Sequence, residues 1–154
     1  MNQTIKGKDL MVFIGGKSIA LATNHTLDIT ANTTDTTTKD DLGKFTNTEV
    51  STIAWSLSSE NLVSLTGSDG KNTIDIIDLA LAGGKVDVVF SLSKPLGEAV
   101  PTGGFIPTTT VGDVTYSGQA VITSVNVNAQ NGEKATYTVQ LAGAGALTKT
   151  TIAE

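Results

Sequence analysis

Residue types that perform chemistry are sparse in this 154-residue chain. It contains no cysteine and a single histidine, His25. The lack of cysteine excludes thiol catalysis, disulfides, iron–sulfur clusters and cysteine-ligated zinc. One histidine also excludes three-histidine zinc sites and HExxH centres within one copy. His25 begins a predicted strand, and no spacing in the sequence brings it together with a serine and an aspartate, so a catalytic triad is not indicated.

The segments that resemble binding loops depart from the motifs they resemble. Gly67-Ser-Asp-Gly70-Lys71-Asn-Thr lacks the P-loop spacing, and we interpret it as a turn that leads into a helix cap. Gly143-Ala-Gly145 lacks the third glycine of a dinucleotide fingerprint. Asp35, Asp40 and Asp41 lack the spacing of a calcium-binding EF-hand and are predicted to lie in a solvated loop. We therefore predict no cofactor, no metal and no enzymatic activity.

The composition restricts the possible partners. Lysine supplies all 10 basic residues against 15 acidic ones, and the net charge is −5. The absence of arginine argues against base-specific nucleic-acid recognition and tight phosphate binding. The sequence contains no apolar run of the ~20 residues that a membrane span needs and no signal peptide at its start. We expect the protein to fold in the cytoplasm of the cell that makes it, without binding a membrane.

Alternating patterns rich in Thr, Ser, Val and Ile predict a mainly β structure. The expected strands are 10–14, 18–22, 25–33, one from residue 52, 86–92, and a pair at 121–128 and 135–141 joined by an Asn131-Gly132 turn. The polar segment Asp35–Val50 is predicted to be a long loop at the tip of two long strands. The proline-containing segment 94–111 is predicted to be irregular.

One helix is predicted between Asn72 and Gly83. Asn72 can cap its start, Asp75 suits its first turn, and Gly83 with Gly84 follows its end. Its apolar surface is broad, so we expect cover on more than one side.

The predicted fold class is an antiparallel β-sandwich or barrel with one flanking helix. We expect a single domain over residues 1–154, with a core at 9–148 and terminal arms at 1–8 and 149–154. The outward faces of the best strands carry Thr, Ser, Asn and Gln but few charges. Such faces are typical of strands that meet other subunits, because exposed sheets usually carry protective charges.

Four segments of the chain resemble, in family order, the major tail (tail tube) proteins of long-tailed bacteriophages. They lie at 16–31, which includes Asn-His-Thr-Leu-Asp-Ile-Thr, at 35–45, at 53–62, which includes Ile-Ala-Trp-Ser-Leu-Ser, and at 131–147, which ends in Gly-Ala-Gly-Ala-Leu. The segment 94–111 matches no motif of the family.

The resemblance implies a structural virion protein. Six copies would close into a ring whose inner strands form one barrel, and stacked rings would form the conduit for the genome. It also implies a place in the virion tail after assembly in the host cytoplasm. The implied partners are further copies of the chain, a tape measure protein, a tail terminator and baseplate or tail-tip proteins, with transient, non-specific passage of DNA.

Combined with the strand pattern, the resemblance identifies two sets of candidate site residues. If the apolar side chains of the long strands (Leu27, Ile29, Ile53, Trp55 and Leu57) face the core, the alternate residues face the channel. The predicted lumen-facing residues are Thr26, Asp28, Thr30, Ser56 and Ser58, with Ser124, Asn126, Thr136 and Thr138 as further candidates. The predicted ring-stacking residues are Lys39, Asp40, Asp41, Lys44 and Phe45.

Two other functions stay open from the sequence. The first is the inner tube of a contractile injection or type VI secretion-like device, which is similar in fold. The second is a β-sandwich binding module, such as a carbohydrate binder. An aromatic content of 5% argues against the second, since such modules display several exposed aromatic rings.

Overall fold

The described residues of the chain form one eight-stranded antiparallel sheet with a single α-helix. The computed structural model describes residues 7, 10–40, 43, 45–66, 70–93 and 105–154. The sheet order is β2-β1-β5-β6-β7-β4-β3, and β8 pairs with β6. The elements are β1 (Leu10–Ile14), β2 (Lys17–Ser18), β3 (Ala22–Asp35), β4 (Thr48–Leu62), α1 (Thr73–Ala82), β5 (Lys85–Leu92), β6 (Val114–Asn128), β7 (Thr136–Gly143) and β8 (Thr148–Thr151). The predicted antiparallel β fold with one flanking helix is confirmed, and the sheet is not closed into a barrel.

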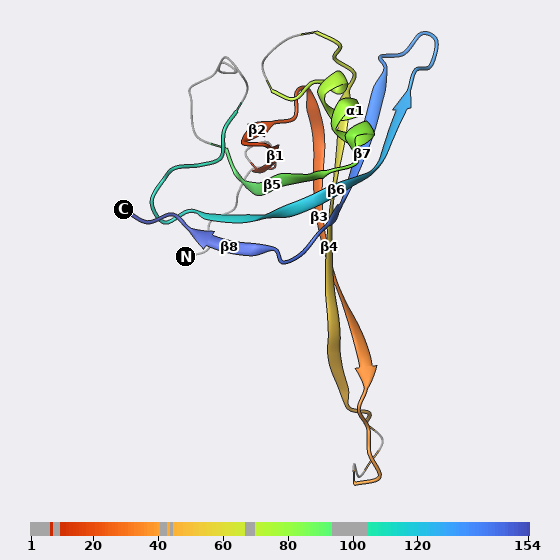
Figure 1. Ribbon diagram of the computed structural model, residues 1–154, viewed down its shortest axis with the longest axis vertical. Coiled ribbons are helices and arrows are strands. Elements are labelled where there is room, and N and C mark those ends of the chain that lie inside the picture. Colours follow the sequence, from red (N-terminus) through yellow and green to blue (C-terminus); the bar gives the residue numbers. More distant parts are fainter. Residues whose placement is uncertain (1–6, 8–9, 41–42, 44, 67–69, 94–104) are drawn as a thin grey trace.

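The sheet folds over on itself because β6 belongs to both of its halves. Its first half pairs with β5 and β8, and its second half, from Ala120 onward, pairs with β7. A register shift between Ile122 and Ser124 lies close to the change of partner. In Figure 1 the strands β5 and β8 accordingly run across the long axis, whereas β3 and β4 run along it.

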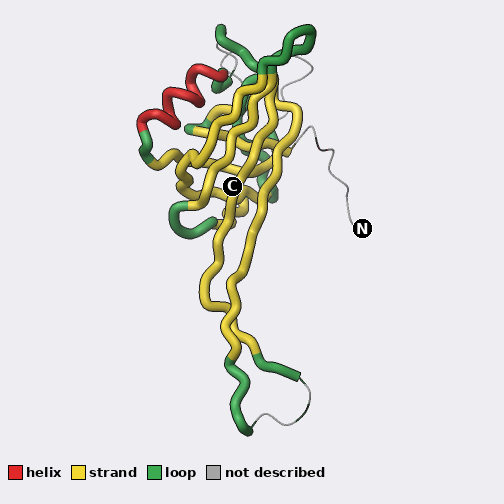
Figure 2. Tube along the Cα trace, turned by 90° about the vertical axis from the view of Figure 1, so that its right-hand side faces the viewer, coloured by secondary structure: helices red, strands yellow, loops and turns green. Residues whose placement is uncertain are grey.

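The hairpin of β3 and β4 projects far beyond the body of the molecule (Figures 1 and 2). The strands are longer than the sequence predicts. β3 begins at Ala22 and continues to Asp35, and β4 begins at Thr48, so the loop at the tip covers residues 36–47 instead of 35–50. Threonine-rich segments at both ends of the expected loop continue the ladder, as in the pair Asp35–Thr48.

Two local expectations are wrong. The strand expected at residues 18–22 is only the two-residue β2, because Leu21 adopts a left-handed backbone conformation with φ of 55° before β3 begins. The expected C-terminal arm contains β8, which pairs with the first half of β6. β7 and β8 thus run as one interrupted strand beside β6, and the interruption covers residues 144–147.

The core lies between the two halves of the folded sheet and beneath α1. Its largest fully buried side chains include Tyr137, Phe13, Ile14, Ile76 and Leu141. Valine, isoleucine and leucine dominate the cluster, as the composition predicts.

The indole ring of Trp55 packs directly against Gly118 and Gly143, and we call this contact surface the glycine seat. A Cβ atom at Gly143 would lie 2.3 Å from the indole, and one at Gly118 would lie 2.8 Å from it. The indole Nε1 donates a hydrogen bond to the carbonyl oxygen of Gly145 at 2.9 Å. The ring therefore joins β4 to β6, to β7 and to the interruption before β8, and only glycine leaves room for it at these two positions.

The predicted helix boundaries are confirmed. Asn72 and Asp75 form a capping box, in which each side chain accepts a hydrogen bond from the other residue's backbone N–H. Gly83 ends the helix in the left-handed conformation. Ile76 is buried, whereas Ile74 and Leu81 are exposed. In the described part of the chain, the broad apolar surface is thus covered on one side only.

We predict that Gly143→Ala destabilises the protein. The added methyl group would overlap the indole of Trp55, and such overpacking costs about 1–3 kcal/mol. Urea unfolding followed by the fluorescence of Trp55 measures the loss. Gly84→Ala is the matched control, because a Cβ atom there meets nothing within 4 Å, and its midpoint should stay within error of the parent. Equal midpoints for all three proteins would contradict the role of the glycine seat.

Candidate assembly surfaces

Four adjacent strands present one continuous polar face. Directly paired residues of neighbouring strands lie on the same side of a sheet. The register pairs Asp28 with Ser56, Ser58 with Gln140, and Gln140 with Ser124. This polar face, formed by β3, β4, β7 and the second half of β6, comprises Thr26, Asp28, Thr30, Glu49, Ser56, Ser58, Glu60, Thr136, Thr138, Gln140, Ser124 and Asn126.

The structure therefore brings together all nine residues predicted to face a channel. Thr26, Asp28 and Thr30 are exposed, and Ser56 and Ser58 are half-buried. Grouping the N-terminal hairpin with the C-terminal pair required the β4–β7 ladder, which local alternation does not reveal. Whether this face lines a channel stays a prediction at this point.

The charges on the polar face are all acidic. β3, β4, β6 and β7 contain no lysine, and the register places Asp28, Glu49 and Glu60 on this side. The sequence analysis missed the two glutamates. Alternation from Ser58 could have found Glu60, but Glu49 lies beyond a register shift, where Ser51 is an extra residue between Thr52 and Val50.

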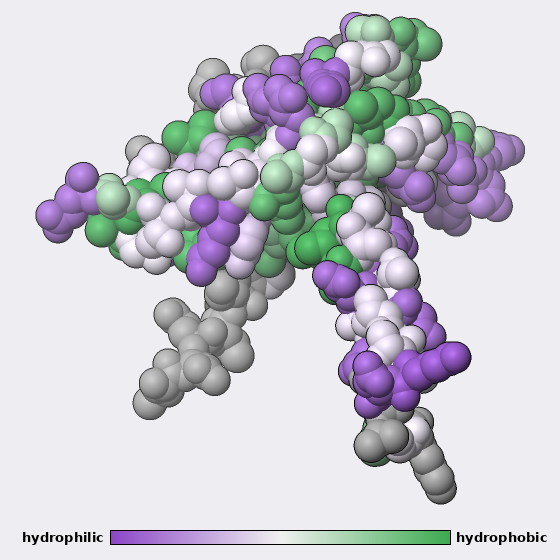
Figure 3. Space-filling view, turned by 60° about the horizontal axis from the view of Figure 1, so that its bottom comes forward, coloured by the Kyte–Doolittle hydropathy of each residue, from purple (hydrophilic) through white to green (hydrophobic). Residues whose placement is uncertain are grey.

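The opposite face of the hairpin differs from its predicted role. Trp55 and Leu57 are buried, and Leu27 packs against the core. Ile29 and Ile53, which we expected in the core, are 60% and 67% exposed. Pairing between β4 and β7 ends at Ser56, so the hairpin leaves the body just beyond Trp55 and nothing in the described chain covers its apolar side. In Figure 3 the projecting hairpin carries mostly polar and neutral residues, with hydrophobic ones where it joins the body.

The tip of the hairpin is held by hydrogen bonds at its neck. The backbone N–H of Thr36 donates to the carbonyl of Asn47 at 2.9 Å, and the N–H of Thr37 donates to Asp35 Oδ1 at 2.8 Å. Hydrogen bonds from the hydroxyl and the N–H of Thr37 lower the pKa of Asp35. The neck thus fixes how the residues at the tip are presented.

The predicted stacking residues lie at this tip as far as they are described. Lys39 and Asp40 are exposed, and Phe45 is 92% exposed. Asp41 and Lys44 lie outside the described residues. A fully exposed phenylalanine at the end of a polar hairpin is unusual for a surface that meets only water.

The four-stranded part of the sheet has two open edges. β3 is the last strand of the sheet, so its outer backbone groups have no strand partner in the described chain. On the other side, β5 pairs with β6 only as far as Val121, so residues 122–128 of β6 have no strand partner there in the described chain, while α1 packs against β6. Open edges are templates for pairing with another chain.

A cavity of about 860 Å³ lies at the start of β3. We call it the His25 cavity. Its lining includes Leu10, Met11, Ile19, Leu21, His25, Phe90 and Phe105, together with Ser18, Thr23, Ser64, Thr66 and Asn72. Nδ1 of His25 is buried without a hydrogen-bond partner, and burial lowers the pKa of this imidazole.

The described residues contain neither a cluster of metal-binding side chains nor a helix suited to span a membrane. No group of three or more His, Asp or Glu side chains is placed to hold a metal ion. None of the helical segments is long and apolar enough to cross a membrane.

The sequence over residues 4–149 matches the model of the family described as phage tail tube protein. Among curated protein sequences, no match was found. The fold resembles several solved tail and injection-tube structures.

A chain from the tail of an empty gene transfer agent particle, computed with C6 symmetry, has a TM-score of 0.72 and 19% identity and covers 96% of this chain and 99% of its own. The SPP1 tail tube has a TM-score of 0.66 and 11% sequence identity, and the match covers 98% of this chain and 81% of the SPP1 chain. A chain of the sheath–tube complex of an extracellular contractile injection system, PVC, has a TM-score of 0.62 and 16% sequence identity. This match covers 97% of this chain and 93% of the PVC chain.

We predict that the stability of the protein falls as the pH drops below neutral, because His25 is buried. Its folded pKa lies below the ordinary value of 6.5, so between these two values the unfolded chain binds more protons. The free energy of unfolding should therefore decrease as the pH falls through 6.5 and level off below the folded pKa. Urea unfolding between about pH 5 and 8 measures this slope. His25→Gln should flatten it, and parallel curves for the two proteins would contradict the prediction.

Proposed function

Because the chain belongs to the phage tail tube protein family, we propose that its copies close into six-membered rings and that the rings stack into a tail tube that conducts DNA. In this role the protein is structural and non-enzymatic. The chain acts as a single domain, and the tube is part of the virion tail. The observation that carries the proposal is the polar face of β3, β4, β7 and β6 with an open strand edge on each side.

The two edges are suited to ring closure. Pairing β3 of one copy with residues 122–128 of β6 in the next would extend the four-stranded face without interruption. Such a contact joins two different surfaces, and it closes a ring when the repeated rotation completes a full turn. It would also satisfy the backbone groups that both edges leave open.

In the proposed ring, the polar face lines the channel. Asp28, Glu49 and Glu60 would then repeat around and along the tube and produce a negative potential. DNA would meet no lysine on these strands, so the counterion release that drives attachment to basic proteins would not occur. Uncharged hydroxyl and amide groups would separate the carboxylates and keep the wall hydrated.

The proposed contact between rings is the tip of the β3–β4 hairpin. Lys39 and Asp40 are exposed there, and Asp41 and Lys44 follow in the sequence. Mixed charges fix the register of an interface more than they strengthen it. The apolar side chains of Ile29 and Ile53 would be covered by neighbouring copies.

A tube of finite length needs other proteins at its two ends. We propose a tail terminator at one end, baseplate or tail-tip proteins at the other, and a tape measure protein within the channel. Among the similar folds are a tube-terminating cap of the anti-feeding prophage and a chain of its baseplate, with TM-scores of 0.63 and 0.62. The exposed Ile74 and Leu81 on α1 offer an apolar surface for contacts outside the ring.

A contractile injection device is the alternative. The resemblance to the PVC sheath–tube complex supports it, because an inner tube of such a device has the same fold. A sheath gene next to the gene for this chain would favour the contractile device, and a gene order without one would favour a tube without a sheath.

Electron microscopy of the purified protein tests the proposal. We expect six-fold rings or hollow tubes at high concentration or after addition of tail-initiation proteins. Three-dimensional reconstruction should place Asp28 on the inner wall. Concentrated protein that remains monomeric by light scattering, and forms neither rings nor tubes with the initiation proteins, would contradict it.

Charge reversal at Asp28 tests the proposed channel lining. In assembled phage, Asp28→Lys should leave the tube length unchanged and slow DNA ejection, most strongly at low salt, because lysine attracts phosphate. Asp28→Asn is the control, and it should eject DNA at nearly the parental rate. Unchanged ejection of the lysine variant at every salt concentration would show that the charge does not act on the DNA.

A further inference from the structure

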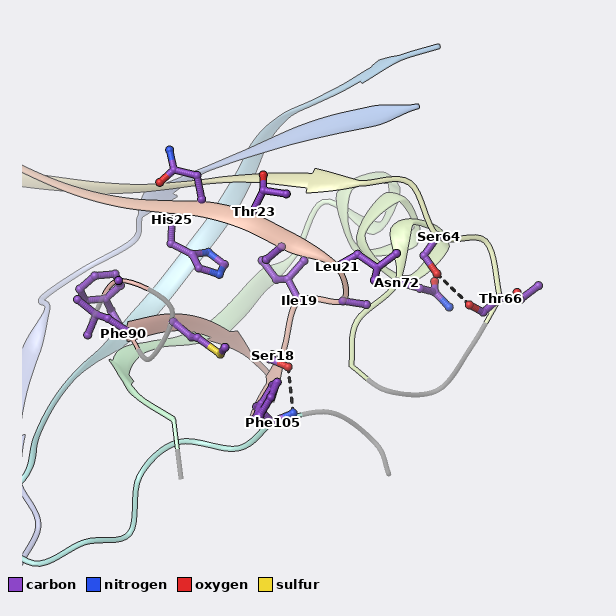
Figure 4. A pocket seen from close by; sticks show the side chains of 16 residues that line it. Ser18, Ile19, Leu21, Thr23, His25, Ser64, Thr66, Asn72, Phe90 and Phe105 are labelled. Atoms are coloured by element: carbon purple, nitrogen blue, oxygen red, sulfur yellow. Dashed lines mark hydrogen bonds between the residues drawn. The ribbon is translucent and has the colours of Figure 1, made fainter. Parts of the chain in front are cut away.

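The His25 cavity is built as a receptor for an apolar group. Its volume of about 860 Å³ lies within the range of ligand sites, and its described lining contains no charged residue. Figure 4 shows Ile19, His25, Phe90 and Phe105 around the hollow, with Ser18 at its side. The Ser18 hydroxyl accepts a hydrogen bond from the Phe105 N–H at 3.0 Å. Among the described lining residues, Nδ1 of His25 is the buried side-chain polar atom without a hydrogen-bond partner.

Phe45 is the side chain of this protein that most needs such a receptor. It is 92% exposed, more than any other large hydrophobic residue of the described chain. It lies at the tip of the projecting hairpin, which the hydrogen bonds of Thr36 and Thr37 with Asn47 hold closed at its neck. A phenylalanine side chain has only two rotatable bonds, so it loses little conformational freedom when it is buried.

The cavity and Phe45 lie at opposite ends of the same strand. His25 is near the start of β3, and the tip follows Asp35 at its end. Ten residues separate these two positions, which corresponds to roughly 33 Å at about 3.3 Å per residue. The hairpin points away from the body that holds the cavity (Figure 1). Phe45 therefore cannot reach the cavity of its own chain, so the His25 cavity that it could enter is that of another copy.

We propose that Phe45 of each copy inserts into the His25 cavity of a copy in the adjacent ring. The proposal rests on the stacked rings of the preceding section and identifies the contact that joins them. The contact joins two different surfaces at opposite ends of the molecule, so it repeats along the axis without closing and extends a filament. The ring of Phe45 fills the apolar part of the cavity, and a polar group from the tip satisfies Nδ1 of His25.

Other exposed apolar side chains fit this role less well. Ile29 and Ile53 lie on the flank of the hairpin, between its tip and the body. Leu81 lies in the last turn of α1, on the body itself. Among the described residues, only Phe45 combines an aromatic ring with a place at the far end of the molecule.

Cross-linking tests the contact directly, because the chain has no native cysteine. Thr46→Cys keeps Phe45 intact and places a thiol beside it, and Thr23→Cys places one in the lining of the cavity. Tubes made from a mixture of the two variants and treated with a short bismaleimide should yield covalent dimers. Thr46→Cys mixed with Lys149→Cys is the matched control, since Lys149 lies on β8 and does not line the cavity. Equal dimer yields in the two mixtures, or none in the first, would overturn the proposal.

Tube growth provides the second measurement. Phe45→Ala should form rings but raise the critical concentration for tubes at least about tenfold, as expected when a central anchor is truncated. Phe45→Leu keeps most of the apolar volume and should grow tubes at close to the parental concentration. Parental growth of the alanine variant would overturn the proposal while leaving the stacked tube intact. Parental protein that forms no rings or tubes would instead contradict the proposed function itself.

One further result would reassign the cavity. If Gln3→Cys cross-links efficiently to Thr23→Cys in the tube and Thr46→Cys does not, the N-terminal residues occupy the cavity. That outcome also overturns the insertion of Phe45.

Discussion

The contact between Trp55 and its glycine seat determines how this molecule divides into a body and a projecting hairpin. The indole lies against Gly118 on β6 and Gly143 on β7, and it donates a hydrogen bond to the carbonyl of Gly145. It sits on β4 one residue beyond Ser56, the last residue of β4 that pairs with β7. The hairpin beyond this point has only its own ladder, so Trp55 is the anchor that fixes where it leaves the body and in which direction it points.

This division gives the same strands two functions. On the body side of Trp55, the apolar side of β4 contributes Leu57 to the core, and the other side of the strand contributes Ser56 and Ser58 to the polar face. On the hairpin, Ile29 and Ile53 lie on the same side of the strands as Trp55 and Leu57, but their side chains are exposed to solvent. An isolated two-stranded ribbon is marginally stable in water. The hairpin therefore depends on the anchor at its base, on the bonds at its neck and, in an assembly, on the copies that cover it.

Sequence patterns predicted the local elements well and the long-range relations poorly. Asn72, Asp75 and Gly83 are enough to predict α1, because caps act over three or four residues. The alternation around Asp28 and Ser56 identified one face of the hairpin. The exposure of Ile29 and Ile53 was missed, because it depends on where β7 ends. β8 was missed because its threonines and lysine show no apolar alternation, and the His25 cavity is formed by segments far apart in the sequence.

The open edges raise the question of why the free chain pairs in one arrangement and not in others. β3 carries Asp28 and Asp35 and no lysine, whereas residues 122–128 of β6 carry no charge at all. Two β3 edges brought together would place four carboxylates along one seam, and like charges across strands are destabilising. A β3 edge against the β6 edge meets only hydroxyl, amide and aliphatic side chains. Asp28, which would repel DNA in the channel, thus also disfavours the symmetric β3–β3 pair together with Asp35, and the head-to-tail contact that a ring requires remains.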